Sequence, residues 1–167
     1  MNSSSEQLAA LLDREMIRNC IARLARGEDR RDAELIGGCF WPDATVEFGI
    51  FAGTFDEYLG WVVPGSPAVP VTQHVLGQSL IELDDETALV ETHVNAYHRM
   101  VGDDGDRDVV IGGRYLDRLE KRGGQWRVGQ RTMLYDWYQE LGRSVDWSQG
   151  LTGMPFSAAY CERYIGR

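Results

Sequence analysis

The second half of the chain contains four strand-like segments, and this pattern limits the possible folds more than any other feature of the sequence. The segments are residues 71–83, 88–100, 108–121 and 126–138. The junctions between them, DDE, GDDGD and RGGQ, are rich in residues that favour tight turns. Because consecutive strands joined by short turns pair in opposite directions, the sequence predicts an antiparallel meander here.

The first half of the chain is predicted to be largely helical. Residues 5–26 carry an apolar stripe at helical spacing, and Gly27 is a natural stop after it. A second, shorter helix is predicted to start at the N-cap residue Asp32 and to run to Phe40. The connector between the two helices, GEDRR, contains Asp29. The stripe of the first helix consists of Leu8, Leu11, Leu12, Ile17, Ile21 and Leu24.

A strand over residues 44–51 and a third short helix over residues 55–63 complete the predicted elements. Helices followed by antiparallel strands make an α+β fold. We therefore expect a cone-shaped, curved sheet, mixed but mainly antiparallel, with three N-terminal helices that enclose one pocket. Residues 1–167 are expected to form a single domain, in which residues 141–167 are a tail that wraps the mouth or a neighbouring subunit.

Charge and composition exclude several functional classes. The net charge is −9 and no basic stripe is present, so nucleic acid and anionic membranes are not expected as partners. No apolar run approaches the roughly 18 residues of a membrane span, and the N-terminus does not resemble a signal peptide. The odd number of scattered cysteines, Cys20, Cys39 and Cys161, suits a reducing cytoplasm. Scattered histidines and the absence of C-x-x-C predict no metal site.

Several segments together resemble the SnoaL-like branch of the nuclear-transport-factor-like cone folds. They are ARGEDRRD, TQHVLG, THVNAYHRM, VIGGRYLDRLEKRGGQWRVGQR and the terminal DWY, within a matched core of residues 5–140. Within this branch the sequence is most similar to small cofactor-free lyases, namely scytalone dehydratase, bile-acid 7α-dehydratase and hexachlorocyclohexane dehydrochlorinase. The resemblance implies a single SnoaL-like domain that needs no cofactor. It also implies a homo-oligomer, either a trimer or a dimer.

The resemblance further implies a catalytic His–Asp dyad. The family Asp follows the first helix and matches Asp29, and the family His lies in the first long strand and matches His74. The dehydrochlorinase also carries an Arg at the position of Arg131. Five residues before the Asp, where these enzymes carry Tyr or Lys, this chain has Leu24, which removes one polar partner for the substrate.

The chemistry of such a dyad follows from its residue types. A carboxylate on one imidazole nitrogen fixes the tautomer and stabilises the imidazolium that forms when the other nitrogen takes a proton. The pair can therefore remove a proton from carbon and return it to a departing hydroxyl group. The alternative readings are structural: Asp29 as a cap between two helices, and His74 as a half-buried strand residue.

Two further polar candidates depend on which face of a strand they occupy. Strict alternation places His98 on the inward face of its strand, together with Ala96, so His98 is a candidate donor to substrate. The same alternation places His93 on the solvent face. Plain alternation from Trp126 places Arg131 outside. A bulge at Gly129 would reset the face and bring Arg131 into the pocket. The sequence leaves these two placements of Arg131 open.

The proposed pocket is apolar, and a set of aromatic residues is its predicted lining. We expect a small apolar cyclic substrate of steroid-like or polyketide-like character, and dehydration by a lyase as the reaction. An isomerase of the ketosteroid type or a polyketide cyclase is the second reading. A non-catalytic ligand-binding domain, or a small subunit of an oxygenase, is the third. The aromatic candidates are Phe48, Trp61, Tyr97, Tyr115, Tyr135 and Trp137.

Overall fold

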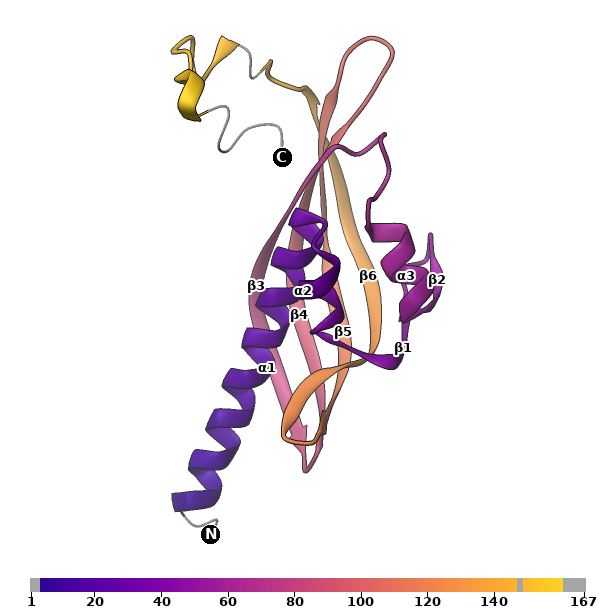
Figure 1. Cartoon of the computed structure of the whole chain (residues 1–167), viewed down its shortest axis with the longest axis vertical. Coiled ribbons are helices and arrows are strands. Elements are labelled where there is room, and N and C mark those ends of the chain that lie inside the picture. Colours follow the sequence, from indigo (N-terminus) through magenta and orange to yellow (C-terminus); the bar gives the residue numbers. More distant parts are fainter. Residues whose placement is uncertain (1–3, 147–148, 161–167) are drawn as a thin grey trace.

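The computed structural model describes residues 4–146 and 149–160. Its helices and strands, in chain order, are α1 (Ser4–Arg30), α2 (Ala33–Gly37), β1 (Phe40–Glu47), β2 (Ala52–Thr54), α3 (Phe55–Val62), β3 (Val71–Asp84), β4 (Thr87–Met100), β5 (Arg107–Arg122) and β6 (Gln125–Arg143). The expected α+β class is confirmed, and Figure 1 shows one long curved sheet with the helices beside it.

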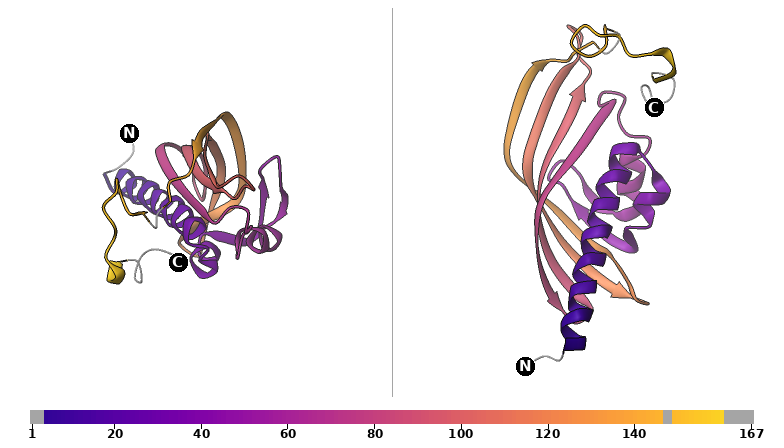
Figure 2. Two further views of the ribbon diagram at one scale, coloured as in Figure 1. Left: turned by 90° about the horizontal axis from the view of Figure 1, so that it is seen from above. Right: turned by 90° about the vertical axis from the view of Figure 1, so that its left-hand side faces the viewer.

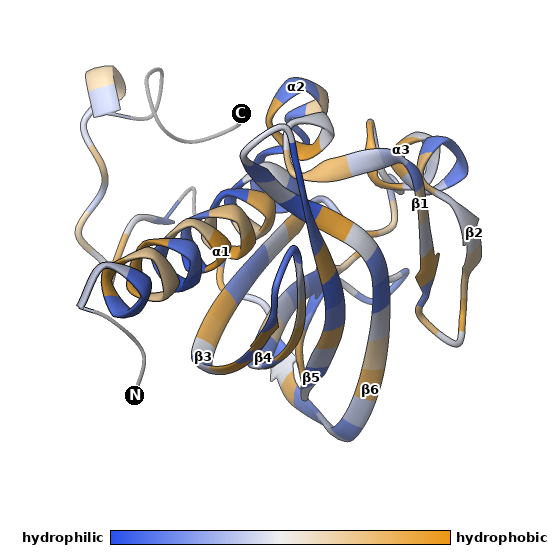
Figure 3. Ribbon diagram, turned by 90° about the horizontal axis from the view of Figure 1, so that it is seen from below, coloured by the Kyte–Doolittle hydropathy of each residue, from blue (hydrophilic) through white to orange (hydrophobic). Residues whose placement is uncertain are grey.

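The six strands form one mainly antiparallel sheet in the order β2-β1-β6-β5-β4-β3. The predicted meander forms β3 to β6, and only β1 pairs in parallel, with β6. The β5–β6 turn has positive φ at both Gly123 (58°) and Gly124 (78°), as a two-residue hairpin loop of type I′ requires, and glycine adopts these angles without strain. Along the strands hydrophobic residues alternate with hydrophilic ones (Figure 3).

The helices α1, α2 and α3 lie on the concave side of the sheet (Figure 2). The core fills the space between these helices and the inward-facing strand residues. On α1 the core begins at Ile17 and includes Ile21 and Leu24. The N-terminal part of the predicted stripe is different, because Leu8, Leu11 and Leu12 are more than half exposed. None of the described helices has the length and apolar character that crossing a bilayer needs.

The first helix does not stop at Gly27, as predicted, but continues for three more residues to Arg30. It ends because Arg31 takes a left-handed conformation (φ 55°) and the Asp32 N–H donates to the Gly27 carbonyl at 3.0 Å. Gly27 has a packing role instead: a Cβ there would lie 2.8 Å from Cγ1 of Ile36 in α2. Asp29 therefore lies in the last turn of α1 and not in a connector.

Replacing Gly27 with alanine should destabilise the protein by about 1–3 kcal/mol, because the added methyl group overlaps Ile36. Denaturant unfolding followed by circular dichroism measures the change. Gly37→Ala is the matched control, since nothing lies within 4 Å of a Cβ at Gly37. If the two variants were equally stable, the close contact between α1 and α2 would not explain the glycine.

Two other predicted boundaries differ from the structure. The second helix has its predicted N-cap, where Asp32 accepts from the Leu35 N–H at 2.9 Å, but it ends at Gly37. Phe40 begins β1 instead, because it pairs with Val128 of β6. Of the predicted strand over residues 44–51, residues 44–47 form the end of β1, and residues 48–51 form the connection to β2. The predicted oligomer, the wrapping role of the tail and the state of Cys161, which lies outside the described residues, stay predictions.

Candidate active site

A cavity of about 320 Å³ lies between the concave face of the sheet and the helices α1 and α3. Its wall is mostly apolar, and its aromatic residues come from α3, β5, β6 and the residue that follows β1. They are Phe48, Tyr58, Trp61, Tyr115, Tyr135 and Tyr138. The polar side chains of the wall are Glu28, Arg31, Ser66, Thr72, His74 and His98. A volume of this size is at the lower end of the range for small-molecule sites.

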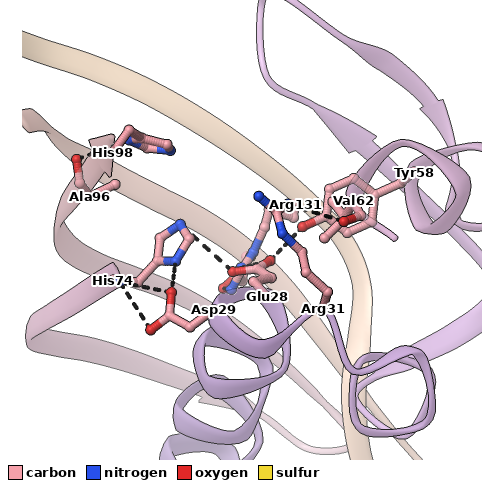
Figure 4. Close-up of polar contacts among 10 residues, drawn as sticks. Glu28, Asp29, Arg31, Tyr58, Val62, His74, Ala96, His98 and Arg131 are labelled. Carbon is pink, nitrogen blue, oxygen red and sulfur yellow. Dashed lines mark hydrogen bonds and ion pairs between the residues drawn. The ribbon is translucent and has the colours of Figure 1, made fainter. Parts of the chain in front are cut away.

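His74 and Asp29 are in direct contact at one side of this cavity (Figure 4). Nδ1 of His74 lies 2.7 Å from Oδ1 of Asp29, and the His74 backbone N–H donates to the same carboxylate at 2.9 and 3.2 Å. The last turn of α1 supplies Asp29, and β3 supplies His74 opposite Ala96 of β4. Because Nδ1 is held by Asp29, Nε2 is the nitrogen available to a ligand in the cavity.

The environment of His74 favours its protonated form. Burial lowers the pKa of His74, but the hydrogen bond to Asp29 and the negative charges of Glu28 and Asp29 outweigh it, so that the pKa lies above its ordinary value. His74 is therefore suited both to accept a proton and to hold it until a leaving group takes it.

Asp29→Asn should lower the pKa of His74, because it removes a charge and the hydrogen bond to a carboxylate while keeping the shape of the side chain. A pH titration of the histidine imidazole NMR signals, assigned with single His variants, measures this. In the wild type we expect one signal to titrate above about 6.5 and that of His98 to titrate below it. An unchanged His74 titration in Asp29→Asn would contradict the pairing.

His98 also lines the cavity, on the inward face predicted for it. Its ring centroid lies 6.3 Å from that of His74, and its Nδ1 is 3.3 Å from the Ala96 carbonyl oxygen. Burial, and then the neighbouring His74, lower the pKa of His98 below its ordinary value. Since a carbonyl oxygen only accepts, this contact favours the tautomer with the proton on Nδ1. Donation from His98 to a substrate, which the sequence suggested, stays a prediction.

Arg131 points inward but does not line the cavity. The register of β5 and β6 shifts at Gly129, where Leu119 pairs with Val128 and Arg118 with Gln130, so the bulge considered from the sequence is present. The guanidinium makes two 2.8 Å bonds to Asp117 and lies 4.0 Å above the Tyr115 ring, which separates it from the cavity. The hypothesis that Arg131 meets the substrate is therefore corrected: its donors are used by buried carboxylates.

Two aromatic residues predicted to line the pocket lie elsewhere. Tyr97 is on the outward face of β4, where its hydroxyl group donates to Asp108 at 2.7 Å. Trp137 is 47% exposed, and its ring covers Gly112 of β5. The neighbouring residue, Ile111, lines the cavity, so Gly112 is on the opposite face of β5 and Trp137 lies on that outer face. The predicted lining rested on aromatic character alone. The alternation of side chains along each strand determines which aromatic residues face the cavity, and Tyr97 and Trp137 are on the other face.

The sequence reasoning missed Glu28, Tyr58 and Thr72. Glu28 is 4% exposed and lies on the buried stripe of α1, four residues after Leu24. Its Oε1 accepts from the Tyr58 hydroxyl at 2.5 Å and from Arg131 Nη1 at 3.5 Å. If the helical spacing of apolar residues in α1 is continued past Gly27, Glu28 falls on the buried stripe. Alternation along β3 places Thr72 on the same face as His74. Within the described part of the chain no cluster of three or more potential metal ligands is present.

The sequence from residue 9 to residue 132 matches the SnoaL-like domain family. The chain belongs to this family. The resemblance found in the sequence is thereby confirmed, and the curved sheet with helices on its concave side is the fold of this SnoaL-like protein. A comparison with the sequences of curated proteins finds no match.

Three solved structures illustrate the likeness in fold. A hexachlorocyclohexane dehydrochlorinase, LinA-type3 from Novosphingobium barchaimii, is 19% identical, with a TM-score of 0.72 over 90% of this chain and 98% of its own. A provisionally assigned scytalone dehydratase from Novosphingobium aromaticivorans is 20% identical (TM-score 0.68; 82% and 91% covered). A provisionally assigned aromatic ring hydroxylase from the same species is 21% identical (TM-score 0.66; 78% and 94% covered). At these identities the likeness shows the fold alone.

Proposed function

We propose that this protein is a cofactor-independent lyase that removes water from a small, neutral, apolar cyclic substrate of steroid-like or polyketide-like character. The observation that carries the proposal is the contact between Asp29 and His74 at the wall of an apolar cavity, with Nε2 of His74 available to a ligand. An acid/base group held beside an apolar chamber is the arrangement that proton transfer at carbon requires.

In the proposed reaction, Nε2 of His74 takes a proton from a carbon atom next to the carbinol carbon. The C–H electron pair becomes the new double bond, the C–O bond breaks, and His74 returns the proton to the departing oxygen, which leaves as water. Asp29 keeps the imidazole in the required tautomer and stabilises its charged form between these two transfers. The same histidine serves both halves of the reaction.

Loss of water suits this site better than loss of halide. A departing halide is an anion that needs a free cationic donor, and both arginines near the site are engaged. Arg131 is bound to Asp117, and Nη1 and Nη2 of Arg31 donate to the carbonyl groups of Val62 and Val69 at 3.1 Å. A hydroxyl group that receives a proton leaves as a neutral molecule and needs no such partner.

An isomerase is the second candidate, and Leu24 is the observation that favours it. Leu24 is fully buried in the core, at the position where the lyases that this sequence resembles carry a polar side chain. A site with fewer polar groups for a leaving hydroxyl is better suited to returning the proton to a second carbon atom. His74 and Asp29 would keep the same roles in that reaction.

A screen of hydroxylated bicyclic, steroid-like and polyketide-like compounds tests the proposal. Mass spectrometry separates the candidates, because a lyase lowers the substrate mass by one water and an isomerase leaves it unchanged. We expect loss of water from at least one compound. Tight binding of members of the screen without any conversion would contradict the lyase and favour a ligand-binding domain.

A further inference from the structure

Two buried polar atoms of the cavity wall have no hydrogen-bond partner. They are Oε2 of Glu28 and Oγ1 of Thr72, and across the described residues they are the only buried side-chain oxygen or nitrogen atoms in this state. Buried polar groups are almost always satisfied, because leaving one unpaired costs about 1–3 kcal/mol. That both exceptions line the same cavity indicates that a ligand supplies their partners.

The carboxylate of Glu28 is held so that only one of its oxygens can bind a ligand. Oε1 is occupied by the Tyr58 hydroxyl and Arg131, whereas Oε2 lies 4.0 Å from Nε2 of His74. His74 thus lies between two carboxylates, with Asp29 on its Nδ1 and Glu28 facing its Nε2 (Figure 4). The Asp29 side is closed by a direct bond, and the Glu28 side is open.

A hydroxyl group fits the space between Glu28 and His74. An oxygen placed about 2.8 Å from both Oε2 and Nε2 spans their separation, and its two hydrogen bonds meet at about 90°. The hydroxyl hydrogen points to Oε2, which can only accept, and a lone pair of the oxygen then faces Nε2 of His74. This is the orientation in which His74 can give a proton to that oxygen.

Glu28 also determines which groups are rejected. A carboxylate or a halide at this position would place a second negative charge beside Glu28 in a mostly apolar cavity, where charges are weakly screened. The two arginines near this position are already engaged, because Arg131 is shared between Glu28 and Asp117 and Arg31 donates to the carbonyl groups of Val62 and Val69. A neutral hydroxyl group therefore gains a charge-assisted bond, and an anion loses affinity.

Thr72 marks a second polar position in the same wall. It lies two residues before His74 in β3, so both side chains point from the same face of the strand. Its unpartnered hydroxyl group can donate to a carbonyl oxygen of a ligand whose hydroxyl group is bound at Glu28. Two separate polar positions in one mostly apolar wall suit a substrate with two separate polar groups on an apolar ring.

We propose that Glu28 and Thr72 are specificity-determining residues that select a neutral cyclic substrate carrying a hydroxyl group, bound at Glu28, and a carbonyl group, bound at Thr72. This inference rests on the proposed function only for the fate of the hydroxyl group, which leaves as water after it takes the proton held by His74. Glu28 gains and loses no proton in this step.

Binding of four compounds with the same ring system, measured by calorimetry or ligand-observed NMR, tests the inference. They are tetralin, 2-tetralol, 2-tetralone and tetralin-2-carboxylate. We expect wild type to bind 2-tetralol at least about tenfold more tightly than tetralin, as a bond to a charged group predicts, and to bind the carboxylate more weakly than both. Equal affinity for 2-tetralol and tetralin, or tightest binding of the carboxylate, would overturn the role of Glu28.

Three variants assign the preferences to individual residues. Glu28→Gln keeps an acceptor and removes the charge, so it should bind the carboxylate more tightly than wild type does. Glu28→Leu should bind 2-tetralol and tetralin equally. Thr72→Val, which keeps the side-chain shape, should lose the preference for 2-tetralone over tetralin, and an unchanged preference would overturn the role of Thr72. If Glu28→Leu does not fold, Glu28→Gln and the wild-type comparison still decide the role of Glu28.

These measurements separate the inference from the proposed function, because they require no turnover. The preference for 2-tetralol over tetralin should persist in a protein that converts no compound of the screen. Conversely, a lyase whose wild-type form does not distinguish the four compounds would keep the function of the dyad and refute the selection by Glu28 and Thr72.

Discussion

His74→Gln should lower kcat/KM for the compound found in the screen by at least about 100-fold, within the 10²–10⁴-fold range of a positioned acid/base group. Glutamine fills similar space and can still bond to Asp29, but it can neither take a proton from carbon nor return one to oxygen. Steady-state kinetics with the wild type and the variant at equal folded concentration measures the effect.

His93→Gln is the matched control for this experiment. His93 is in β4, its side chain is 67% exposed, and it points away from the cavity, so this variant should keep the wild-type rate. Circular dichroism should show that both variants are folded. Full activity of His74→Gln would contradict the proposed role of the histidine, and an equal loss in both variants would point to a general effect on the fold.

Arg131→Met should destabilise the fold by about 3–5 kcal/mol, because it leaves the carboxylates of Asp117 and Glu28 buried without their cation. Arg131 is 1% exposed, and both carboxylates are buried with it. Burial opposes the charge of Arg131, but Asp117 and Glu28 outweigh this and hold the pKa of the guanidinium above its usual range. The midpoint of urea unfolding measures the loss.

The control for Arg131 is Arg114→Met, which removes an arginine that pairs with Asp136 near the surface at 2.8 and 3.0 Å. Because water and salt screen such a pair, its removal should shift the midpoint much less. Equal midpoints for the two variants would show that the buried pairing of Arg131 contributes little to stability. A stable but inactive Arg131→Met protein would instead argue for a direct role of the guanidinium in catalysis.

Much of the fold follows from local patterns in the sequence. Alternation of apolar residues and the turn sequences around Asp85 and Gly123 define the meander, since the chemistry of short turns is local. The N-cap at Asp32 is local for the same reason. The role of Gly27 is not local, because the close approach that needs a residue without a Cβ is made by Ile36 of another helix.

The candidate site was only partly predictable, for physical reasons that differ between its residues. Asp29 and His74 came from the family resemblance, because their contact joins positions that are 45 residues apart. Glu28 was missed because the predicted helix ended at residue 26, two residues before it. The face of β6 on which Arg131 lies depends on the bulge at Gly129. Its guanidinium group is bound to Asp117 and does not reach the cavity, and the alternation of strand residues does not reveal this pairing.

The most direct test uses the compound found in the screen, with every hydrogen on the carbon atoms next to the carbinol carbon replaced by deuterium. If His74 removes a hydrogen from one of these carbon atoms and the hydroxyl group leaves, the product has lost one deuterium atom and keeps the others. Mass spectrometry of the product measures the loss. We expect loss of one deuterium atom together with the hydroxyl group in the wild-type protein, whereas a product that retains every deuterium atom would contradict proton abstraction by the Asp29–His74 pair.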